Sequence, residues 1–467
     1  MSKEKNKSIY IIAICGTGMS ALAGLLKKSG RSVIGSDTNI YPPVSDLLDK
    51  YGIEIKPGYK KENVPSDADL IIIGNAVSKT NPEAEAAIES GIRYVSFPEA
   101  LGEYFLQDNK SLVVVGTHGK TTTSSLLAWM LEGTGQKPGF LIGGWLKNFD
   151  SNYGYPEGNY FVVEGDEYDT AFFDKGPKFL HYRPYASVLT GIEFDHADIY
   201  DNLEQIQDNF RKFVSIINPQ GFLLVEDSKK NMENVLDAAS CQIETYGFSE
   251  SADWEIKNYT HSDGIGTFSL FYNQKLAGDF SLPMIGQYNV QNGAAVAAMG
   301  LKLGISPNAI NDALLKFKGI KRRQEIVGVK NNIIVMDDFA HHPTAIKLTI
   351  DAVCEAYPGR RVWAVFEPRS ATSRRNLFQK ELPESLMAAD KIILTKLFSP
   401  HKIKPENRFD LSNAVKDLNN KGKDAYLIPE VEDIIDYIVY NNKPGDIILI
   451  MSSGGFDNIH RKLLERL

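Results

Sequence analysis

The stretch VVVGTHGKTTTS, residues 113–124, decides how the middle of this chain folds. Its valines predict a buried strand, its glycines predict a tight turn, and a helix is expected to begin near Lys120. This order favours an anion site, because turn amides and a helix N-terminus both attract phosphate. The common phosphate loop, G-x-x-x-x-G-K-[ST], would need glycine at position 114, where this chain has Val114.

The turn therefore predicts a nucleotide site built on a shorter, variant loop. Lys120 is placed to reach the outer phosphates, and the hydroxyl of Thr121 can bind Mg²⁺. The alternative is an ordinary strand-to-helix connection in which Gly-Lys-Thr occurs by accident. The candidate phosphate-binding residues are Gly116, Thr117, His118, Gly119, Lys120, Thr121 and Thr122.

Outward from this loop, apolar β-branched runs alternate with helical patterns, which is typical of parallel α/β sheets. Three such blocks open with strands predicted at 9–15, 111–116 and 331–339. The polar stretch 241–285 is expected to add side strands to the second block. We place the domain boundaries so that the three domains are 1–107, 108–321 and 322–467.

Composition excludes several classes of protein. The net charge of −8 provides no basic field for nucleic acid. Cys15, Cys241 and Cys354 are far apart, so neither a disulfide scaffold nor a structural zinc site is expected. The basic residues 1–8 precede too few apolar residues for a signal sequence, and no run approaches the roughly 18 needed to span a membrane. We expect a soluble cytoplasmic protein without nucleic-acid partners or membrane insertion.

A second glycine turn, CGTGMSALAG at 15–24, follows the first predicted strand. It fits the G-x-G-x-x-A version of the dinucleotide fingerprint, and Asp37 ends the next strand about 20 residues on, as that fingerprint requires. The motif indicates a diphosphate on a helix end without identifying the nucleotide. A nicotinamide dehydrogenase would use the same geometry, and a plain tight turn is the other alternative.

Two polar segments follow strands of the second block. FVVEGDEYDTAFFD, at 161–174, places Glu164 at a strand end, where a carboxylate opposite a phosphate loop usually holds Mg²⁺. The alternative there is a solvated acidic loop. His196 lies between Asp195 and Asp198 after the next strand. Taken alone, such a histidine is more often a hydrogen-bonded structural residue.

Five further positions are candidates because of their place in the chain. Asn289 and Asn292 begin an alanine-rich helix, where they either cap it or face adenine. Arg322 and Arg323 lie at the predicted hinge, where an arginine can reach a γ-phosphate. The alternative is that these charges belong to a solvated linker without a ligand. Arg369 follows a strand of the third block and can grip a carboxylate, unless its loop is merely basic.

Taken together, these stretches resemble the Mur ligases, ATP-dependent enzymes that join amino acids or peptides to the UDP-N-acetylmuramoyl carboxylate. The motifs that carry the resemblance occur together across nearly the whole sequence, and their combination is far more specific than any single motif. The motifs are GTGMS, GTHGKTTT, EGDEYD, IEFDHAD, GQYNVQN, KRR and DDFAHHP. The resemblance implies an N-terminal Rossmann-like UDP-binding domain, a central P-loop ATPase domain with a mainly parallel sheet plus side strands, and a C-terminal Rossmann-like α/β domain.

The resemblance also implies roles for individual residues. Lys120 and the loop amides should hold the β- and γ-phosphates of ATP. The resemblance assigns Mg²⁺ to Thr121, Glu164 and His196, adenine to Asn289 and Asn292, the γ-phosphate to Arg322 or Arg323, the ribose to Asp338, the phosphate side to His341, and the UDP part to Gly16, Thr17, Gly18, Met19, Ser20 and Asp37.

Within the family, the sequence favours members that join the tripeptide L-Ala-γ-D-Glu-meso-diaminopimelate from cell-wall turnover over those that join L-alanine. The stretch EGDEYDTAFFDKGPKFLHYRP and the motif FEPRS are similar to the tripeptide-joining members. Arg369 should then meet the far carboxylate of the peptide. There are departures: Gly165 stands where alanine is usual, ATS follows FEPRS where N-T-M is usual, and Phe210 replaces a lysine that several relatives carbamylate, so no carbamate is expected.

The expected substrates are therefore UDP-N-acetylmuramate, the tripeptide and ATP, with Mg²⁺ as cofactor. The alternative within the family is ligation of L-alanine. Two functions of other classes also compete: an NAD(P)-binding oxidoreductase that uses the turn at 15–24, and a P-loop switch or motor that hydrolyses ATP. The sequence indicates no oligomeric state.

Overall fold

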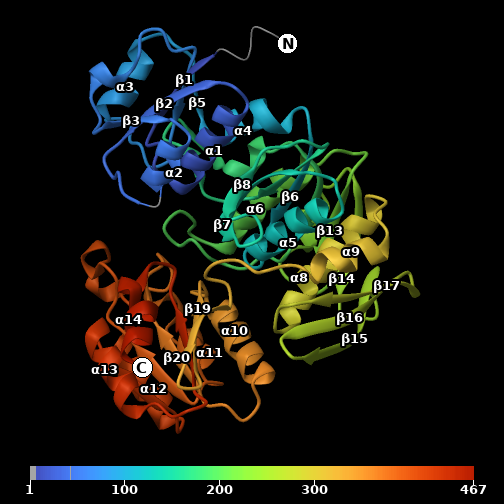
Figure 1. Cartoon of the computed structure of the whole chain (residues 1–467), viewed down its shortest axis with the longest axis vertical. Coiled ribbons are helices and arrows are strands. Elements are labelled where there is room, and N and C mark those ends of the chain that lie inside the picture. Colours follow the sequence, from blue (N-terminus) through green and yellow to red (C-terminus); the bar gives the residue numbers. More distant parts are fainter. Residues whose placement is uncertain (1–6, 43) are drawn as a thin grey trace.

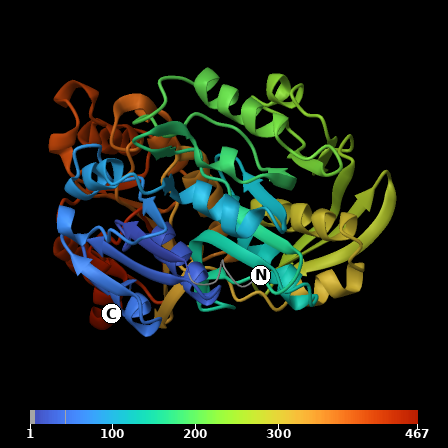
Figure 2. The same ribbon diagram turned by 90° about the horizontal axis from the view of Figure 1, so that it is seen from above.

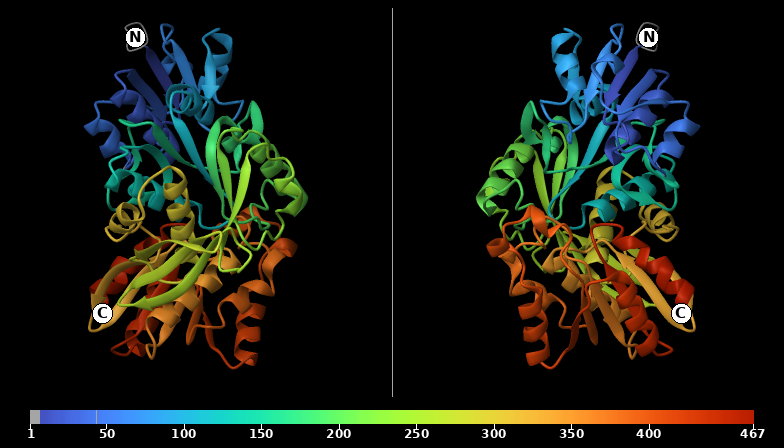
Figure 3. Two further views of the ribbon diagram at one scale, coloured as in Figure 1. Left: turned by 90° about the vertical axis from the view of Figure 1, so that its right-hand side faces the viewer. Right: turned by 90° about the vertical axis from the view of Figure 1, so that its left-hand side faces the viewer.

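The computed structural model describes residues 7–42 and 44–467, so the basic residues at 1–6 lie outside the described part of the chain. Figure 1 shows three α/β domains that follow one another down the long axis of the molecule in chain order. Both side views in Figure 3 place the central domain between the other two. The expected three-domain α/β class is confirmed.

The N-terminal domain contains a parallel sheet with the strand order β3-β2-β1-β4-β5. Its order changes direction at β1, and β1 leads into the glycine turn before α1. The first strand is shorter than the predicted 9–15, because Ala13 adopts a positive φ of 65° just after the strand ends. The strands are β1 Ser8–Ile12, β2 Ser32–Asp37, β3 Glu54–Pro57, β4 Leu70–Ile73 and β5 Tyr94–Ser96; the helices are α1 Thr17–Lys28, α2 Val44–Lys50, α3 Pro82–Glu89 and α4 Phe97–Leu101.

The central domain contains a ten-stranded sheet in the order β17-β16-β15-β14-β13-β12-β6-β9-β7-β8. The strand that precedes the phosphate loop, β6, pairs in parallel with β12 and β9. The strands are β6 Lys110–Val115, β7 Gly139–Leu146, β8 Ser151–Gly154, β9 Tyr160–Glu164, β12 Pro184–Leu189, β13 Phe222–Glu226, β14 Gln242–Gly247, β15 Trp254–Ser262, β16 Ile265–Tyr272 and β17 Lys275–Leu282, with a separate hairpin of β10 Asp169–Ala171 and β11 Asp174–Pro177. The helices are α5 Lys120–Gly133, α6 Leu203–Ser215, α7 Glu233–Leu236, α8 Gln287–Lys302 and α9 Pro307–Leu314.

The side strands expected in 241–285 are present. β15, β16 and β17 extend the sheet through antiparallel pairs, and Figure 2 shows these strands at one side of the molecule.

The C-terminal domain contains a six-stranded sheet in the order β18-β19-β23-β20-β21-β22. All its pairs are parallel except β18–β19. The sequence did not predict β18, because the first strand expected in this domain was 331–339. The strands are β18 Glu325–Lys330, β19 Ile333–Asp338, β20 Val362–Phe366, β21 Lys391–Leu394, β22 Asp424–Leu427 and β23 Ile447–Met451; the helices are α10 Pro343–Ala356, α11 Glu381–Ser385, α12 Leu411–Asn420, α13 Val431–Asn441 and α14 Ile459–Arg466.

The alternation of side chains along β6 positions the phosphate loop. Val113 and Val115 pack into one hydrophobic cluster, and Leu112 and Val114 pack into the cluster on the opposite face. The first cluster also takes in α1 of the N-terminal domain, so those two domains share one core. Because β6 is buried on both faces, the loop after it is held at the carboxyl edge of the sheet. No helix in the described ranges has both the length and the apolar character needed to cross a membrane.

Candidate active site

The loop after β6 needs glycine at two points. Gly116 has φ +132° and Gly119 has φ +78°, values that other residues rarely adopt. A Cβ at Gly116 would overlap the hydroxyl of Thr190, and one at Gly119 would lie 2.8 Å from Asn292 Oδ1. The Thr190 hydroxyl donates to the carbonyl of His118, which ties the loop to the strand beside it. The tight turn predicted from sequence is therefore fixed by its neighbours as well as by its glycines.

Lys120 begins α5 and points back over the loop. Its Nζ donates to the carbonyl of Gly116 at 2.6 Å and to Glu167 Oε1 at 2.9 Å. Burial lowers the pKa of Lys120, but the attraction of Glu167 outweighs it and the pKa is raised. The ammonium is therefore charged at neutral pH and lies over the turn that is expected to hold phosphate.

Glu167 is the residue at this site that the sequence reasoning did not select. Its Oε1 also meets His196 Nε2 at 3.0 Å, while its buried Oε2 has no hydrogen-bond partner among the described residues. Burial raises the pKa of Glu167, but nearby Lys120 outweighs burial and the pKa is lowered. The available signal was its place in the acidic run after β9, three residues beyond Glu164. A buried carboxylate with one unused oxygen can accept a cation or a donor group.

The Mg²⁺ ligands expected on α5 and β9 lie together. Thr121 Oγ1 donates to Glu164 Oε1 at 2.8 Å, and the amide of Gly143 donates to Glu164 Oε2 at 2.7 Å. Hydroxyl and carboxylate oxygens are the donors that Mg²⁺ takes in proteins, so these residues fit the ion. Most of the acidic run has other partners: for example, Asp166 forms an ion pair with Lys178 at 2.6 Å. The solvated-loop alternative does not hold for Glu164.

His196 adopts a positive φ of 54° and has both ring nitrogens engaged. Nε2 meets Glu167 as described, and Nδ1 lies 2.8 Å from the hydroxyl of Tyr168. Burial lowers the pKa of His196, but the hydrogen bond that the ring donates to the Glu167 carboxylate outweighs burial and the pKa is raised. To bind a metal, His196 would have to give up one of these partners, so its metal role stays a prediction. Its hydrogen-bonded surroundings match the structural alternative.

The two asparagines of α8 do not cap that helix. Its N-cap is Gly286, and no side chain makes a capping hydrogen bond there in the described structure. Asn292 Oδ1 instead accepts from Thr123 Oγ1 at 3.1 Å, and Asn289 Nδ2 donates to the carbonyl of Ile285 at 2.8 Å. The capping alternative was wrong because both side chains point into the interface with α5 and the hinge. Their contact with adenine stays a prediction.

The structure separates the two hinge arginines. Arg323 NH2 donates to Thr121 Oγ1 at 3.2 Å, so its guanidinium reaches the phosphate loop. Arg322 NH2 donates to the carbonyls of Ser452 and Gly454, both at 2.6 Å, within the C-terminal domain. Of the pair, Arg323 is the one that reaches the loop, and the contact of either arginine with a γ-phosphate stays a prediction.

Asp338 and His341 lie where the C-terminal domain meets the central one. Asp338 ends β19, is buried, and accepts the amides of Gln324 and Ala340, both at 2.7 Å. Burial raises the pKa of Asp338. His341 Nε2 lies 3.7 Å from Asp195 Oδ2 across the domain boundary. Asp338 therefore shapes the hinge, and its ribose contact stays a prediction.

The N-terminal turn is organised by Asp37. Its Oδ2 accepts the amide of Cys15 and its Oδ1 that of Asn39, both at 2.9 Å, so the carboxylate is used inside the turn. Along the rest of the turn, Gly16 and Thr17 are exposed, Gly18 is partly exposed beside a phenylalanine ring, and Met19 and Ser20 are buried. The exposed part of the turn could present backbone amides of the helix start to a diphosphate.

Arg369 lies in a separate pocket of about 640 Å³ in the C-terminal domain. Its guanidinium carbon is 3.7 Å from the ring centroid of Phe398, and NH1 lies 3.6 Å from Glu367 Oε1. A Cβ at Gly454 would overlap Arg369, so that glycine makes room for the side chain. Arg408 also lines the pocket. Two arginines beside an aromatic ring are suited to a carboxylate on an extended ligand.

Comparison with known proteins identifies similar sequences across the whole chain. Family models match at residues 8–108 (Mur ligase family, catalytic domain), 114–300 (Mur ligase middle domain) and 322–454 (Mur ligase, glutamate ligase domain). The UDP-N-acetylmuramate–L-alanyl-γ-D-glutamyl-meso-2,6-diaminoheptandioate ligase of Escherichia coli K12 is 39% identical over 460 residues, 98% of each chain. A UDP-N-acetylmuramate–L-alanine ligase of Carboxydothermus hydrogenoformans is 34% identical, covering 99% of this chain and 97% of its own. Among solved structures, a murein peptide ligase from Psychrobacter arcticus matches with TM-score 0.70 and 34% identity over 98% of each chain.

Proposed function

This chain belongs to the Mur ligase family, and we propose that it joins the tripeptide L-Ala-γ-D-Glu-meso-diaminopimelate to UDP-N-acetylmuramate. Members of the family are ATP-dependent ligases that form ADP, which sets aside the oxidoreductase and switch hypotheses. The tripeptide is supported by the greater identity to the E. coli tripeptide ligase, 39%, than to the alanine ligase of C. hydrogenoformans, 34%. The domain boundaries at 107/108 and 321/322 stay predictions.

One observation carries the proposal: cationic and oxygen-donor groups from two domains converge on the phosphate loop. Lys120 lies over the loop, Thr121 and Glu164 lie beside it, and Arg323 reaches it from the hinge. Two anions, a carboxylate and a triphosphate, must approach each other for ligation. Positive charge held at that point lowers the barrier because it offsets their repulsion.

The reaction then proceeds in two steps. A muramoyl carboxylate oxygen attacks the γ-phosphorus of ATP, the bond to the bridging oxygen breaks, and ADP leaves behind an acyl phosphate. The alanine amine of the tripeptide attacks the acyl carbonyl carbon, the carbon–oxygen bond breaks, phosphate leaves, and the nitrogen loses its proton. No residue is assigned as the acceptor of that proton.

Each group at the loop has a part in the first step. We propose that Lys120 exchanges its contact with the Gly116 carbonyl for the β- and γ-phosphates, and that Arg323 meets the γ-phosphate. Thr121 and Glu164 would hold Mg²⁺, which when bound supplies further neutralisation of the phosphate charge. The C-terminal domain closes over this point and excludes water from the acyl phosphate.

The remaining contacts are proposed from the family roles. Asn289 and Asn292 would face adenine, which requires their amides to exchange partners inside the interface. The exposed residues Gly16 and Thr17 would receive the UDP diphosphate, which requires the Gly16 amide to give up its bond to the carbonyl of Ala13. The unused oxygen of Glu167 offers a further cation ligand beside the proposed site of His196.

The pocket at Arg369 is the proposed site for the distal end of the peptide. Replacing Arg369 with alanine should raise the KM for the tripeptide about tenfold or more, because a charge-assisted hydrogen bond is worth about 1.5–3 kcal/mol. The kcat should change less. Lys421→Ala, which removes an exposed charge from the same domain, is the matched control. An unchanged KM for the Arg369 variant would show that the distal end of the peptide does not bind in this pocket.

Substrate dependence tests the function itself. Phosphate release from ATP is measured with UDP-N-acetylmuramate together with either the tripeptide or free L-alanine. We expect turnover with the tripeptide, far slower turnover with L-alanine, and none when the muramoyl nucleotide is omitted. Faster turnover with L-alanine would establish the alternative acceptor, and release without either acceptor would contradict ligation.

A further inference from the structure

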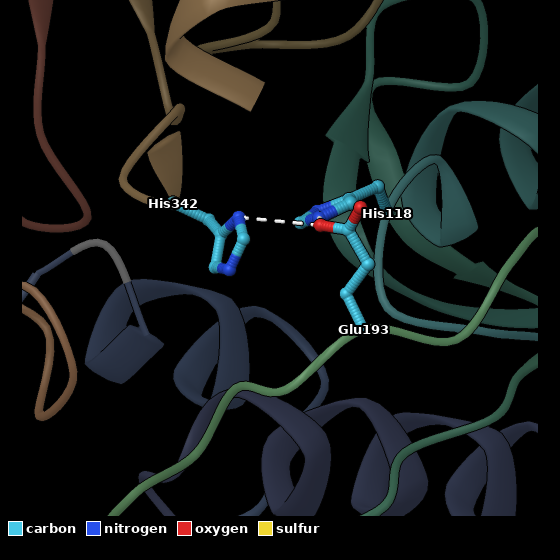
Figure 4. Close-up of side chains that lie close together, drawn as sticks. All are labelled: His118, Glu193 and His342. Carbon is cyan, nitrogen blue, oxygen red and sulfur yellow. Dashed lines mark hydrogen bonds and ion pairs between the residues drawn. The ribbon is translucent and has the colours of Figure 1, made fainter. Parts of the chain in front are cut away.

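A second group of metal-binding side chains lies between the central and C-terminal domains, apart from the proposed Mg²⁺ ligands. It consists of His118 in the phosphate loop, Glu193 in the segment after β12, and His342 just before α10 (Figure 4). One ligand atom from each residue lies within 4.8 Å of the others. His118 is also a candidate phosphate-binding residue, but Glu193 and His342 have no part in the ligation chemistry described above.

The spacing of these atoms is close to that of a metal site. His118 Nε2 lies 3.0 Å from Glu193 Oε2, and His342 Nδ1 lies 3.6 Å from the same oxygen. Ligand atoms held about 2.0–2.1 Å from a tetrahedral Zn²⁺ lie about 3.3–3.4 Å from one another. These two separations fall on either side of this value, and the two histidine nitrogens lie within 4.8 Å of each other, so side-chain rotations would have to bring the histidines together around the ion.

His342 directs the unprotonated Nδ1 of its ring towards the group. Its Nδ1 accepts the amide of Thr344 at 3.3 Å, and its Nε2 faces the carbonyl of Phe194 at 3.2 Å, so the proton belongs on Nε2. A carbonyl that holds the second ring nitrogen is the usual support for a metal-bound histidine. Burial lowers the pKa of His342 to about 4, so the ring is neutral at neutral pH, as metal ligation requires.

Glu193 supplies the charge. The hydrogen bond from His118 lowers its pKa to about 2, so it is ionised at neutral pH. Thr344 Oγ1 also donates to Glu193 Oε2 at 2.7 Å and can keep the carboxylate oriented. The His118 and Glu193 side chains are 25% and 27% exposed, which leaves room for a water molecule as a fourth ligand.

We propose that His118, Glu193 and His342 bind one divalent transition-metal ion of the zinc class, and that the ion links the phosphate loop to the C-terminal domain. Two imidazoles and one carboxylate favour such ions over Mg²⁺, which takes oxygen ligands. On binding, the His118 proton moves from Nε2 to Nδ1, and the ion replaces the Thr344 amide as the partner of His342 Nδ1.

The test is zinc binding to the full-length protein in excess Mg²⁺, measured by competition with a chromophoric chelator. We expect one Zn²⁺ per chain, and at least a tenfold loss of affinity in each of His118→Ala, Glu193→Gln and His342→Ala, since altering a supporting contact alone costs about 10–100-fold. His401→Ala, which removes an exposed histidine elsewhere in the C-terminal domain, should bind like the wild type.

Thermal unfolding without metal shows which variants are folded, and Glu193→Gln preserves side-chain size if the alanine variants fail. Cobalt absorption provides a second measurement, because Co²⁺ in a site of this kind absorbs visible light and water-bound Co²⁺ absorbs it weakly. Absence of a bound equivalent in the wild type would overturn the proposal. Unchanged affinity in either His118→Ala or His342→Ala would overturn the link between the two domains. Ligase activity of the wild type with Mg²⁺ tests the proposed function separately, so failure of either test leaves the other standing.

Discussion

The central domain meets its two neighbours through different kinds of surface. Against the N-terminal domain the contact is apolar: α1 and the buried ring of Tyr153 belong to one shared hydrophobic cluster. Gly24 on α1 leaves space for that ring, since a Cβ there would overlap the Tyr153 hydroxyl. Separating these domains would expose the shared core to water, so we expect them to move as one body.

Against the C-terminal domain the contact is mainly polar. Thr372 Oγ1 donates to Asp195 Oδ1 at 2.6 Å, and Arg323 donates to Thr121. Ile285 and Tyr288 are the central-domain residues that the described structure assigns to the C-terminal core. Hydrogen bonds of this kind exchange with water at little net cost, so this boundary can open and close. The chemistry is proposed at the boundary that can move, where closure completes the site.

The largest expected effect is on catalysis at the polar boundary. Lys120→Ala should lower kcat for ATP-dependent ligation by about 10³-fold or more, because it removes the charge that offsets the approach of two anions. Steady-state phosphate release measures this, and Lys137→Ala, an exposed lysine paired with Glu157, is the matched control. If the Lys120 variant turned over nearly as fast as the control, Lys120 would not be part of the phosphate site.

The second effect distinguishes the two hinge arginines. Arg323→Ala should lower kcat by about 10²-fold, as loss of a donor aimed at developing charge does. Arg322→Ala should instead act mainly on stability, because its side chain is bonded to carbonyls within the C-terminal domain. Parallel kinetics and thermal unfolding of both variants separate the two roles. Equal kcat values for the two variants would mean that Arg323 is no more important for catalysis than Arg322.

At the apolar boundary the expected effect is on stability. Gly24→Ala should lower the free energy of unfolding by about 1–3 kcal/mol, because the added methyl group crowds the Tyr153 ring. Denaturant unfolding measures the loss, and kcat at saturating substrates should change little. Adding Tyr153→Ala to this variant should not add a second full penalty, since the crowding is then absent. A large loss of kcat without loss of stability would mean that this boundary also takes part in turnover.

The smallest expected effect is the pH dependence of the polar boundary. Glu193 has a folded-state pKa lowered from 4.5 to about 2, mainly through the hydrogen bond from His118. Its contribution to stability is therefore present above pH 4.5 and is lost as the pH falls from 4.5 towards 2. We expect a contribution of about 1 kcal/mol, since the pair is partly exposed.

Thermal unfolding of the wild type and Glu193→Gln between pH 6 and pH 3 tests this dependence. The wild type should be the more stable protein at the upper end, and the difference should shrink as the pH falls. A difference that is constant with pH would mean that ionisation of Glu193 does not hold the boundary.

Much of the fold was predictable because local patterns define it. The valines of β6, the glycines after it and the helix beginning at Lys120 were all identified from a single stretch of sequence. The side strands in 241–285 were also anticipated, although their antiparallel pairing was not, and β18 was missed because its short run is only partly buried. Register and strand order could not be predicted, since they depend on pairing between segments far apart in the chain.

The sequence by itself determined the glycine turn, the basic and acidic residues near it, and the division of the chain into parallel α/β blocks, because backbone preference and hydrophobic period act over a few residues. Only the tertiary structure decided that Glu167 meets Lys120, that Arg323 faces the loop while Arg322 turns away, and that the asparagines of α8 do not cap it. Arg323 and Thr121, for example, are 202 positions apart in the chain. Contacts over such separations depend on how whole domains pack, and no local pattern encodes that.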